Sequence, residues 1–228
     1  MTDKPMIFSA EMVRALMLGT KTQTRRIIKP TPDYGGGGDP RAPQNWNDPE
    51  AWGWEDAEAG CWRMLSEGYT GRPYYGRGMR LWVREAHAFV PASAYRNSLF
   101  VEQRTDPGDP DRAAIYREGF DRSTGGIRWR PSIHMPRWAS RLTLVVTDVR
   151  VQRISEITLG ECWAEGCETA RDLIDADVIP KGAQMPFKEF RDLWNSLHSP
   201  DAWARNDCVV ALTFTVHRCN IDQMEATE

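Results

Sequence analysis

The stretch Gly-Thr-Lys-Thr-Gln-Thr-Arg-Arg at residues 19–26 gathers side chains that could carry out hydrolytic chemistry. A threonine hydroxyl becomes a nucleophile when a base takes its proton, and a lysine removed from water can be that base because burial lowers its pKa. Lys21 and Thr24 are therefore a candidate base and nucleophile. In a second route Lys21 stays charged, Lys21 and Thr24 polarise a scissile carbonyl, and a carboxylate activates water. The residue types leave both routes open.

The same stretch is also compatible with an ordinary polar connection at the edge of a strand. Lys21 and Thr24 are three residues apart, so on a strand their side chains would point to opposite faces. Both serve one site only if the backbone turns between them. Arg25 and Arg26 also alternate, so one of them is expected to face the site and to recognise a phosphate or carbonyl, unless it forms an ion pair.

Further along the chain, four more residues are candidates for contact with a substrate. Glu85 could hold Lys21 or a substrate amino group, but a salt bridge at the end of a strand is the more ordinary role. His134 and Trp138 lie in a segment with two prolines, and rigid loops of this kind often line pockets. Trp82 and Trp138 could each stack on a nucleobase, and each could instead pack in the core.

The elements that position these residues can be predicted from the pattern of apolar and capping residues. Ser9 and Gly19 are suitable ends for a helix between them, and a strand with period two follows from Lys21 to Ile28. Thr158 and Glu161 form a capping box that starts a short helix, and Gly166 ends it, which places Glu165 in its last turn. The remaining elements are expected as strands at 78–90, 142–154 and 208–218 and as a helix at 186–198.

Two segments rich in glycine, proline and aspartate, at about 31–77 and 91–128, interrupt this pattern as insertions; the second could instead be a long hairpin. Too few helices separate the strands for a doubly wound sheet. We therefore expect an α+β fold in which a small curved sheet or barrel is flanked by helices. The whole chain, residues 1–228, is expected to form this single domain with its two insertions.

Composition excludes several classes of protein. The formal net charge of −3 argues against broad electrostatic attraction to duplex nucleic acid. The five cysteines form no CxxC pair and the four histidines are scattered, so no zinc site is expected and the cysteines are expected to be reduced. The start of the chain lacks the apolar region of a signal peptide, and no apolar run approaches 18 residues. These observations predict a cytoplasmic protein that does not span a membrane.

Several motifs in fixed order resemble the ASCH domain, a member of the PUA-like β-barrel superfamily. The motifs are "KTQTRR", "LWVRE", "IHMPRWASR" and "AEG". The likeness is to the ASCH proteins common in phage and prophage genomes and covers roughly residues 5–30, 77–90 and 129–218. It leaves both insertions unexplained, and the chain is about twice as long as the small ASCH enzymes.

The resemblance implies a cleft that receives a base or nucleoside. In the bacterial N4-acetylcytidine amidohydrolases of this family a lysine, a threonine three residues later and a distant glutamate are catalytic; they correspond here to Lys21, Thr24 and Glu165, with Glu161 as a rival. The implied reaction is hydrolysis of an exocyclic amide without metal or organic cofactor. The alternative is a non-catalytic module that binds RNA or modified DNA. The expected substrate contacts are Arg25, Arg26, Trp82, Glu85, His134 and Trp138.

Overall fold

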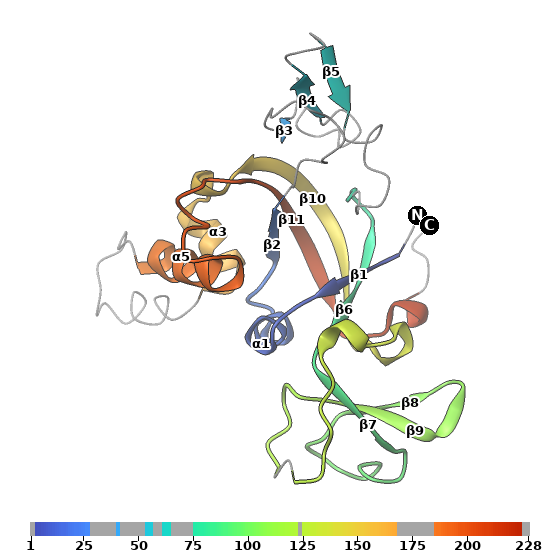
Figure 1. The fold of residues 1–228 in the computed structure, drawn as a ribbon. Helices are drawn as coiled ribbons and strands as arrows, with labels where there is room; N and C mark the ends of the chain where they lie inside the picture. Colours follow the sequence, from blue (N-terminus) through green and yellow to red (C-terminus); the bar gives the residue numbers. More distant parts are fainter. Residues whose placement is uncertain are drawn as a thin grey trace. The chain divides into compact units, whose positions relative to one another are not determined.

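The structure is a computed structural model that describes residues 3–27, 40–41, 53–56, 61–64, 75–122, 125–167 and 185–224. Figure 1 shows the elements in chain order. The helices are α1 (Ala10–Leu18), α3 (Leu159–Ala164) and α5 (Met185–Leu197), with short 3₁₀ turns η2 (Ser132–His134), η3 (Arg137–Ala139), η4 (Ile154–Glu156) and η5 (Ile221–Gln223). The strands are β1 (Lys4–Ile7), β2 (Gln23–Ile27), β3 (Pro40–Arg41), β4 (Gly53–Asp56), β5 (Cys61–Met64), β6 (Arg80–Arg84), β7 (His87–Pro91), β8 (Gln103–Asp106), β9 (Asp109–Tyr116), β10 (Thr143–Arg153) and β11 (Cys208–His217).

The strands form a mixed α+β fold, as the sequence predicts. The largest sheet has the order β1-β6-β10-β11-β2, in which β1 runs parallel to β6 while β10 and β6, and β11 and β2, are antiparallel. Two smaller antiparallel sheets have the orders β3-β4-β5 and β7-β9-β8. Strands β1 and β2 are the two ends of the large sheet, and no pairing between their described residues closes it into a barrel.

The contacts between residues divide the chain into two compact units. The first unit contains Met1–Gly19, Gly78–Val145 and Thr215–Glu228, and the second contains Thr20–Arg77 and Val146–Phe214. The sequence-based expectation of one domain over the whole chain stays a prediction. Among the described helices, none combines the length and the apolar character that crossing a membrane requires.

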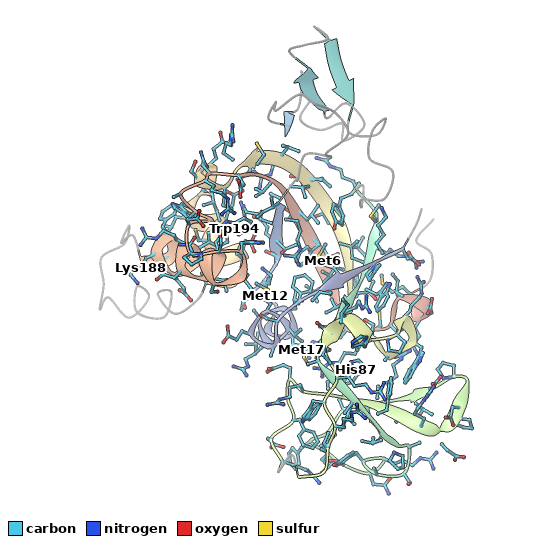
Figure 2. All side chains as sticks on the ribbon, in the orientation of Figure 1. Met6, Met12, Met17, His87, Lys188 and Trp194 are labelled. Atoms are coloured by element: carbon cyan, nitrogen blue, oxygen red, sulfur yellow. The ribbon has the colours of Figure 1, made fainter. Side chains whose placement is uncertain are left out.

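In the first unit, α1 has the ends that the sequence predicts. The Met12 amide donates to Ser9 Oγ at 3.4 Å, and Gly19 ends the helix with a left-handed φ of 80°. The left-handed backbone conformation costs glycine little free energy because glycine has no Cβ. Met12 and Met17 of this helix are labelled in Figure 2. Val13 and Leu16, which lie between these two methionines in the sequence, are buried.

The predicted strand at 78–90 is wrong as a single element. Residues Arg80–Arg84 form β6 in the five-stranded sheet, whereas His87–Pro91 form β7 in a different sheet with β9 and β8. The break falls at Glu85 and Ala86, because the Glu85 carboxylate turns to Arg141 and the His87 backbone pairs with Arg130. Within the predicted insertion at 91–128, β8 and β9 form a hairpin over residues 103–116, which is part of the segment for which a long hairpin is the alternative prediction.

In the second unit, β2 pairs with β11 and the helices α3 and α5 pack on a shared apolar core. Thr158 and Glu161 form the capping box that the sequence predicts, since the Glu161 amide bonds to Thr158 Oγ1 and the Glu161 carboxylate accepts the Thr158 amide. Trp194 of α5 is buried, whereas Lys188 is exposed and pairs with Asp192 (Figure 2). The buried core residues are Ile154, Ile157, Cys162, Cys167, Phe190, Trp194, Ala202 and Val209. Of the predicted insertion at 31–77, only β3, β4, β5 and residues 75–77 fall within the described residues.

Candidate functional site

Lys21 lies in the short connection before β2, which begins at Gln23 rather than at Lys21. Two backbone hydrogen bonds fix this connection: the Thr22 amide donates to the Ala164 carbonyl at 2.8 Å, and the Phe214 amide donates to the Thr22 carbonyl at 3.0 Å. The first bond holds the connection beside the end of α3. The residue after Ala164 is Glu165, so the backbone alone brings the lysine and the glutamate to the same place.

The Lys21 ammonium and the Glu165 carboxylate form a buried pair. Lys21 Nζ donates to Glu165 Oε2 at 2.7 Å and to the Glu165 backbone carbonyl at 2.8 Å. Lys21 has no exposed surface and Glu165 is 5% exposed. The two residues are 144 positions apart in the sequence. A buried charge is stable only when it is paired and hydrogen-bonded, and each of these side chains meets that condition through the other.

Arg25 holds the second oxygen of the same carboxylate. Its Nη1 donates to Glu165 Oε1 at 2.9 Å, and its Nη2 lies 3.1 Å from Glu161 Oε2. Arg25 is 2% exposed, and its guanidinium carbon lies 5.9 Å from the centre of the Phe190 ring. With Lys21 on one oxygen and Arg25 on the other, the Glu165 carboxylate has a fixed orientation.

The electrostatics of this group favour proton transfer between Lys21 and its surroundings. Burial lowers the pKa of Lys21, the Glu165 carboxylate opposes that shift, and the positive charge of Arg26 adds to it. The pKa remains below its ordinary value. A buried lysine with a lowered pKa next to a carboxylate can accept or donate a proton nearer neutral pH than an exposed lysine can.

Glu161, the rival of Glu165, has other partners. Its carboxylate accepts the Thr158 amide and pairs with Arg150 as well as Arg25. Burial by itself would raise the pKa of Glu161, but the Thr158 amide and the Arg150 guanidinium lower it below its usual value. The carboxylate in contact with Lys21 is that of Glu165.

Thr24 lies on a different side of β2 from this group. It is 1% exposed and pairs with Leu212 of β11. Its neighbour Arg25 points to Glu165, and because side chains alternate along a strand, Thr24 points to the opposite face. Within the described part of the chain, no hydrogen bond joins Thr24 to Lys21 or Glu165. Arg26 follows on the same face as Thr24, is half-buried, and donates to the Arg25 carbonyl at 3.2 Å.

Of the other candidates, Glu85 belongs to the first unit and forms an ion pair there. Arg141 Nε and Nη2 donate to its two oxygens at 2.8 and 2.9 Å, and the Arg141 guanidinium carbon lies 4.1 Å from the centre of the Tyr116 ring. Glu85 is 2% exposed. The salt bridge, which is one of the two roles open to Glu85 from the sequence, is the one that the structure shows.

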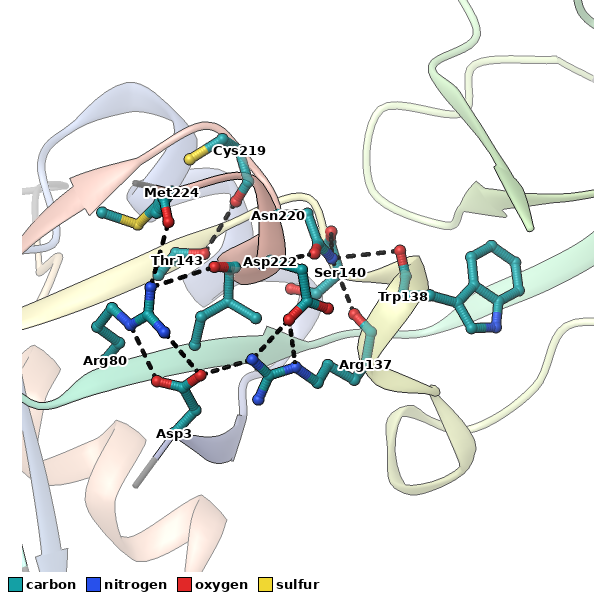
Figure 3. A network of polar contacts seen from close by, with 11 residues as sticks. Asp3, Arg80, Arg137, Trp138, Ser140, Thr143, Cys219, Asn220, Asp222 and Met224 are labelled. Atoms are coloured by element: carbon teal, nitrogen blue, oxygen red, sulfur yellow. Dashed lines mark hydrogen bonds and ion pairs between the residues drawn. The ribbon is translucent and has the colours of Figure 1, made fainter. Parts of the chain in front are cut away.

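The aromatic candidates Trp82 and Trp138 are packed in the first unit. Trp82 is 9% exposed, with the Arg84 guanidinium carbon 5.3 Å from its ring centre. Trp138 stacks on Phe89 with ring centres 5.7 Å apart. Figure 3 shows the Trp138 carbonyl accepting a hydrogen bond from the Asn220 amide, which also binds the carbonyls of Arg137 and Ser140.

The candidate His134 is exposed at the end of η2, also in the first unit. The structure therefore brings Lys21, Arg25 and Glu165 together in the second unit, and it places Trp82, Glu85, His134 and Trp138 in the first.

Sequence reasoning missed several residues of these networks, among them Arg141, Arg150 and Asn220. Arg141, the partner of Glu85, ends the "IHMPRWASR" motif, so its place in that motif was the available signal. Nothing in the sequence around Arg150 or Asn220 indicated that they bind Glu161 and the three carbonyls, respectively. Among the described residues, no group of three or more His, Cys, Asp or Glu is arranged to hold a metal ion.

Comparisons with known proteins do not extend this description. No family model matches the chain. Neither the curated proteins nor the solved structures compared with it give a match.

Proposed function

We propose that the protein is a metal-independent amidohydrolase with a PUA-like barrel that removes the acyl group from the exocyclic nitrogen of a modified nucleoside such as N4-acetylcytidine. The observation that supports this proposal is the contact between Lys21 and Glu165. The motif resemblance implies these two residues as catalytic without reference to any structure. Their side chains are 2.7 Å apart and buried, although 144 positions separate them in the sequence.

The geometry favours the route in which water attacks the acyl carbonyl. Glu165 takes a proton from the attacking water, and Lys21 provides positive charge at the carbonyl oxygen and a proton for the departing N4 nitrogen. The products are the free nucleoside and the carboxylic acid. The other route requires Lys21 to deprotonate Thr24, and the direction of Thr24 on β2 counts against it. The same direction keeps Thr24 away from the carbonyl, so in this proposal Lys21 alone polarises it.

Arg25 positions the base. Its bond to Glu165 Oε1 leaves Oε2 for the exchange of a proton with Lys21 or water. Because Lys21 has no exposed surface, the substrate must displace the side chains that cover it before the chemistry begins. Exclusion of water from such a site strengthens the interaction of the lysine with the developing oxyanion.

The proposal is tested by incubating the purified protein with N4-acetylcytidine and related acylated nucleosides and following the free nucleoside by chromatography. We expect turnover by the wild type and loss of turnover in Lys21→Ala with the fold retained by circular dichroism. The matched control is Lys188→Ala, because Lys188 is exposed and pairs only with a neighbouring carboxylate on its own helix among the described residues. This control is expected to keep wild-type activity.

Two results would contradict the proposal. Turnover that survives in Lys21→Ala would remove the lysine from the chemistry. No turnover across the panel, together with measurable binding of an oligonucleotide, would favour a non-catalytic module that binds RNA or modified DNA.

A further inference from the structure

The segment from 78 to 145 is basic, although the chain as a whole has a formal net charge of −3. It contains eleven arginines, no lysine and seven acidic residues. Most of these carboxylates already have partners: Glu85 and Glu102 pair with Arg141, Asp106 and Asp109 pair with Arg112, and Glu118 pairs with Arg14.

Several arginines in the loops that flank β8 and β9 differ from Arg112 and Arg141, which are paired with carboxylates. Within the described ranges of the chain, no carboxylate oxygen lies within ion-pair distance of Arg96, Arg117, Arg122 or Arg128, and all four residues are exposed. A protein surface that concentrates guanidinium groups without internal counter-charges attracts anions.

Two of these arginines lie over a row of aromatic rings. The Arg122 guanidinium carbon is 6.0 Å from the centre of the Tyr95 ring, and that of Arg117 is 5.4 Å from the Trp129 ring. Phe120 links the two rings through edge-to-face contacts, with centre distances of 5.8 Å to Tyr95 and 5.4 Å to Trp129. We call these five residues the arginine–aromatic surface.

The arginine–aromatic surface is rigidly supported. Its rings are half-buried and pack on a core made by Ala88, Val101 and Ile115, which come from or flank the β7-β9-β8 sheet. Arg122 Nη2 also donates to Ser98 Oγ at 3.0 Å. Guanidinium groups held in this way lose less rotational freedom when they bind a ligand than free side chains do.

We propose that the arginine–aromatic surface binds single-stranded nucleic acid. A guanidinium that lies over an aromatic ring offers its outer plane to a nucleobase, and its N–H edge can bind phosphate. An acidic peptide would use the charges but has no planar groups to stack on these planes, so the alternation of arginines and rings favours bases. This inference concerns only the first unit and does not depend on the proposed amidohydrolase activity.

The binding is expected to depend only weakly on salt. Each phosphate contact with a single strand adds roughly 0.7 to the slope of log K against log salt. With at most five exposed arginines in these loops, we expect a slope no steeper than about −3.5.

The test measures the anisotropy of fluorescently labelled oligo(U) and oligo(dT) with the full-length chain. Arg117→Ala and Arg122→Ala are each expected to weaken binding about tenfold, the effect of losing one stacked base. The matched control is Arg112→Ala. Arg112 lies on β9, is exposed and also has its guanidinium carbon over a ring, 5.2 Å from the centre of Phe89, but its guanidinium is held by Asp106. This control is expected to change binding less than twofold.

Fold and activity give independent checks on the variants. Arg117 and Arg122 are exposed and have no ion pair among the described residues, so their variants should keep the circular dichroism spectrum and thermal midpoint of the wild type, and Arg112→Ala should keep the spectrum. Hydrolysis of free N4-acetylcytidine, if the protein has this activity, should also stay unchanged in Arg117→Ala. Binding of either oligonucleotide supports the proposal, and a preference for one identifies the sugar that is recognised.

Three results would overturn the inference. The first is the absence of oligonucleotide binding by the wild type at low salt. The second is an equal loss of affinity in Arg112→Ala and Arg117→Ala, which would indicate an effect of net charge alone. The third is displacement of the oligonucleotide by poly-glutamate at an equal concentration of charge, which would assign the surface to an acidic polypeptide.

Discussion

Replacing Glu165 by alanine tests whether the buried charge group of the second unit is present as described. The substitution removes the acceptor of one bond from Lys21 at 2.7 Å and one from Arg25 at 2.9 Å. Lys21 keeps only the backbone carbonyl of residue 165, and Arg25 keeps only Glu161 as a charged partner among the described residues. Removing one member of a buried ion pair costs about 3–5 kcal/mol because the remaining charge has no counter-ion.

The matched control is Glu161→Ala on the same helix. Glu161 also pairs with arginines, but its side chain is 12% exposed, against 4% for Glu165. Its loss removes the reciprocal bond of a capping box and partly solvated ion pairs, which together contribute about 1–2 kcal/mol. The expected difference between the two substitutions is therefore about 1–4 kcal/mol.

A double-mutant cycle makes the test specific for the pair. In Lys21→Met combined with Glu165→Ala, the stranded ammonium is absent, so the double variant is expected to be more stable than the sum of the single effects by about 0.5–3 kcal/mol. The assay is urea unfolding followed by tryptophan fluorescence and circular dichroism, whose transitions must coincide for the free energies to be defined. Equal costs for Glu165→Ala and Glu161→Ala, or strict additivity in the cycle, would refute the reasoning.

Three further predictions concern the packing around the two candidate regions. Asn220→Ala should destabilise the protein by about 2–3 kcal/mol, because it leaves three backbone carbonyls without the buried amide that now donates to them. Asn220→Asp should not restore stability, because a carboxylate cannot donate to these carbonyls. An unchanged melting temperature in Asn220→Ala would contradict this prediction. Burial raises the pKa of Cys162 to about 12 and also raises that of Cys167, so unfolded thiols ionise first and the free energy of unfolding should fall as pH rises above about 9. Cys162→Ala should reduce that slope in urea titrations, and an identical slope would count against it. Glu85→Ala should cost about 3–5 kcal/mol in thermal unfolding because it strands Arg141, whereas a cost near zero would mean that the pair is solvated.

Local elements of this fold could be predicted from the sequence because their signals lie within a few residues. Ser9 and Gly19 mark the ends of α1, and the bond pattern of Thr158 with Glu161 starts α3. In each case the capping group and the backbone group that it satisfies are separated by about one helical turn. The sequence pattern and the structure therefore respond to the same short-range hydrogen bonds.

The division of the strand at 78–90 could not be predicted in this way. No glycine or proline interrupts residues 79–90, so the pattern of one long strand and that of two short strands look alike. What separates them is Arg141, 56 residues away, which holds the Glu85 carboxylate. A contact between residues this far apart in the sequence leaves no periodic pattern of residue types.

The candidate site shows the same limit. The family resemblance implied that Lys21 acts with Glu165 or with its rival Glu161, and the structure places Lys21 in contact with Glu165. Neither the complete burial of Lys21 nor the second bond from Arg25 follows from residue type, because lysine and arginine are among the residues least often buried. The alternation of Thr24 and Arg25 on β2 could be predicted from the strand pattern, whereas the start of β2 at Gln23, which leaves Lys21 in the connection beside α3, could not.

The most direct test of the central claim is the kcat/KM for N4-acetylcytidine of Glu165→Gln compared with that of Glu161→Gln. Both substitutions keep the size of the side chain and remove one carboxylate from α3 or its end. We expect Glu165→Gln to lower kcat/KM by a factor of about 10²–10⁴ and Glu161→Gln to keep kcat/KM within a few-fold of the wild-type value. Equal activity in the two folded variants would contradict the assignment of Glu165 as the base.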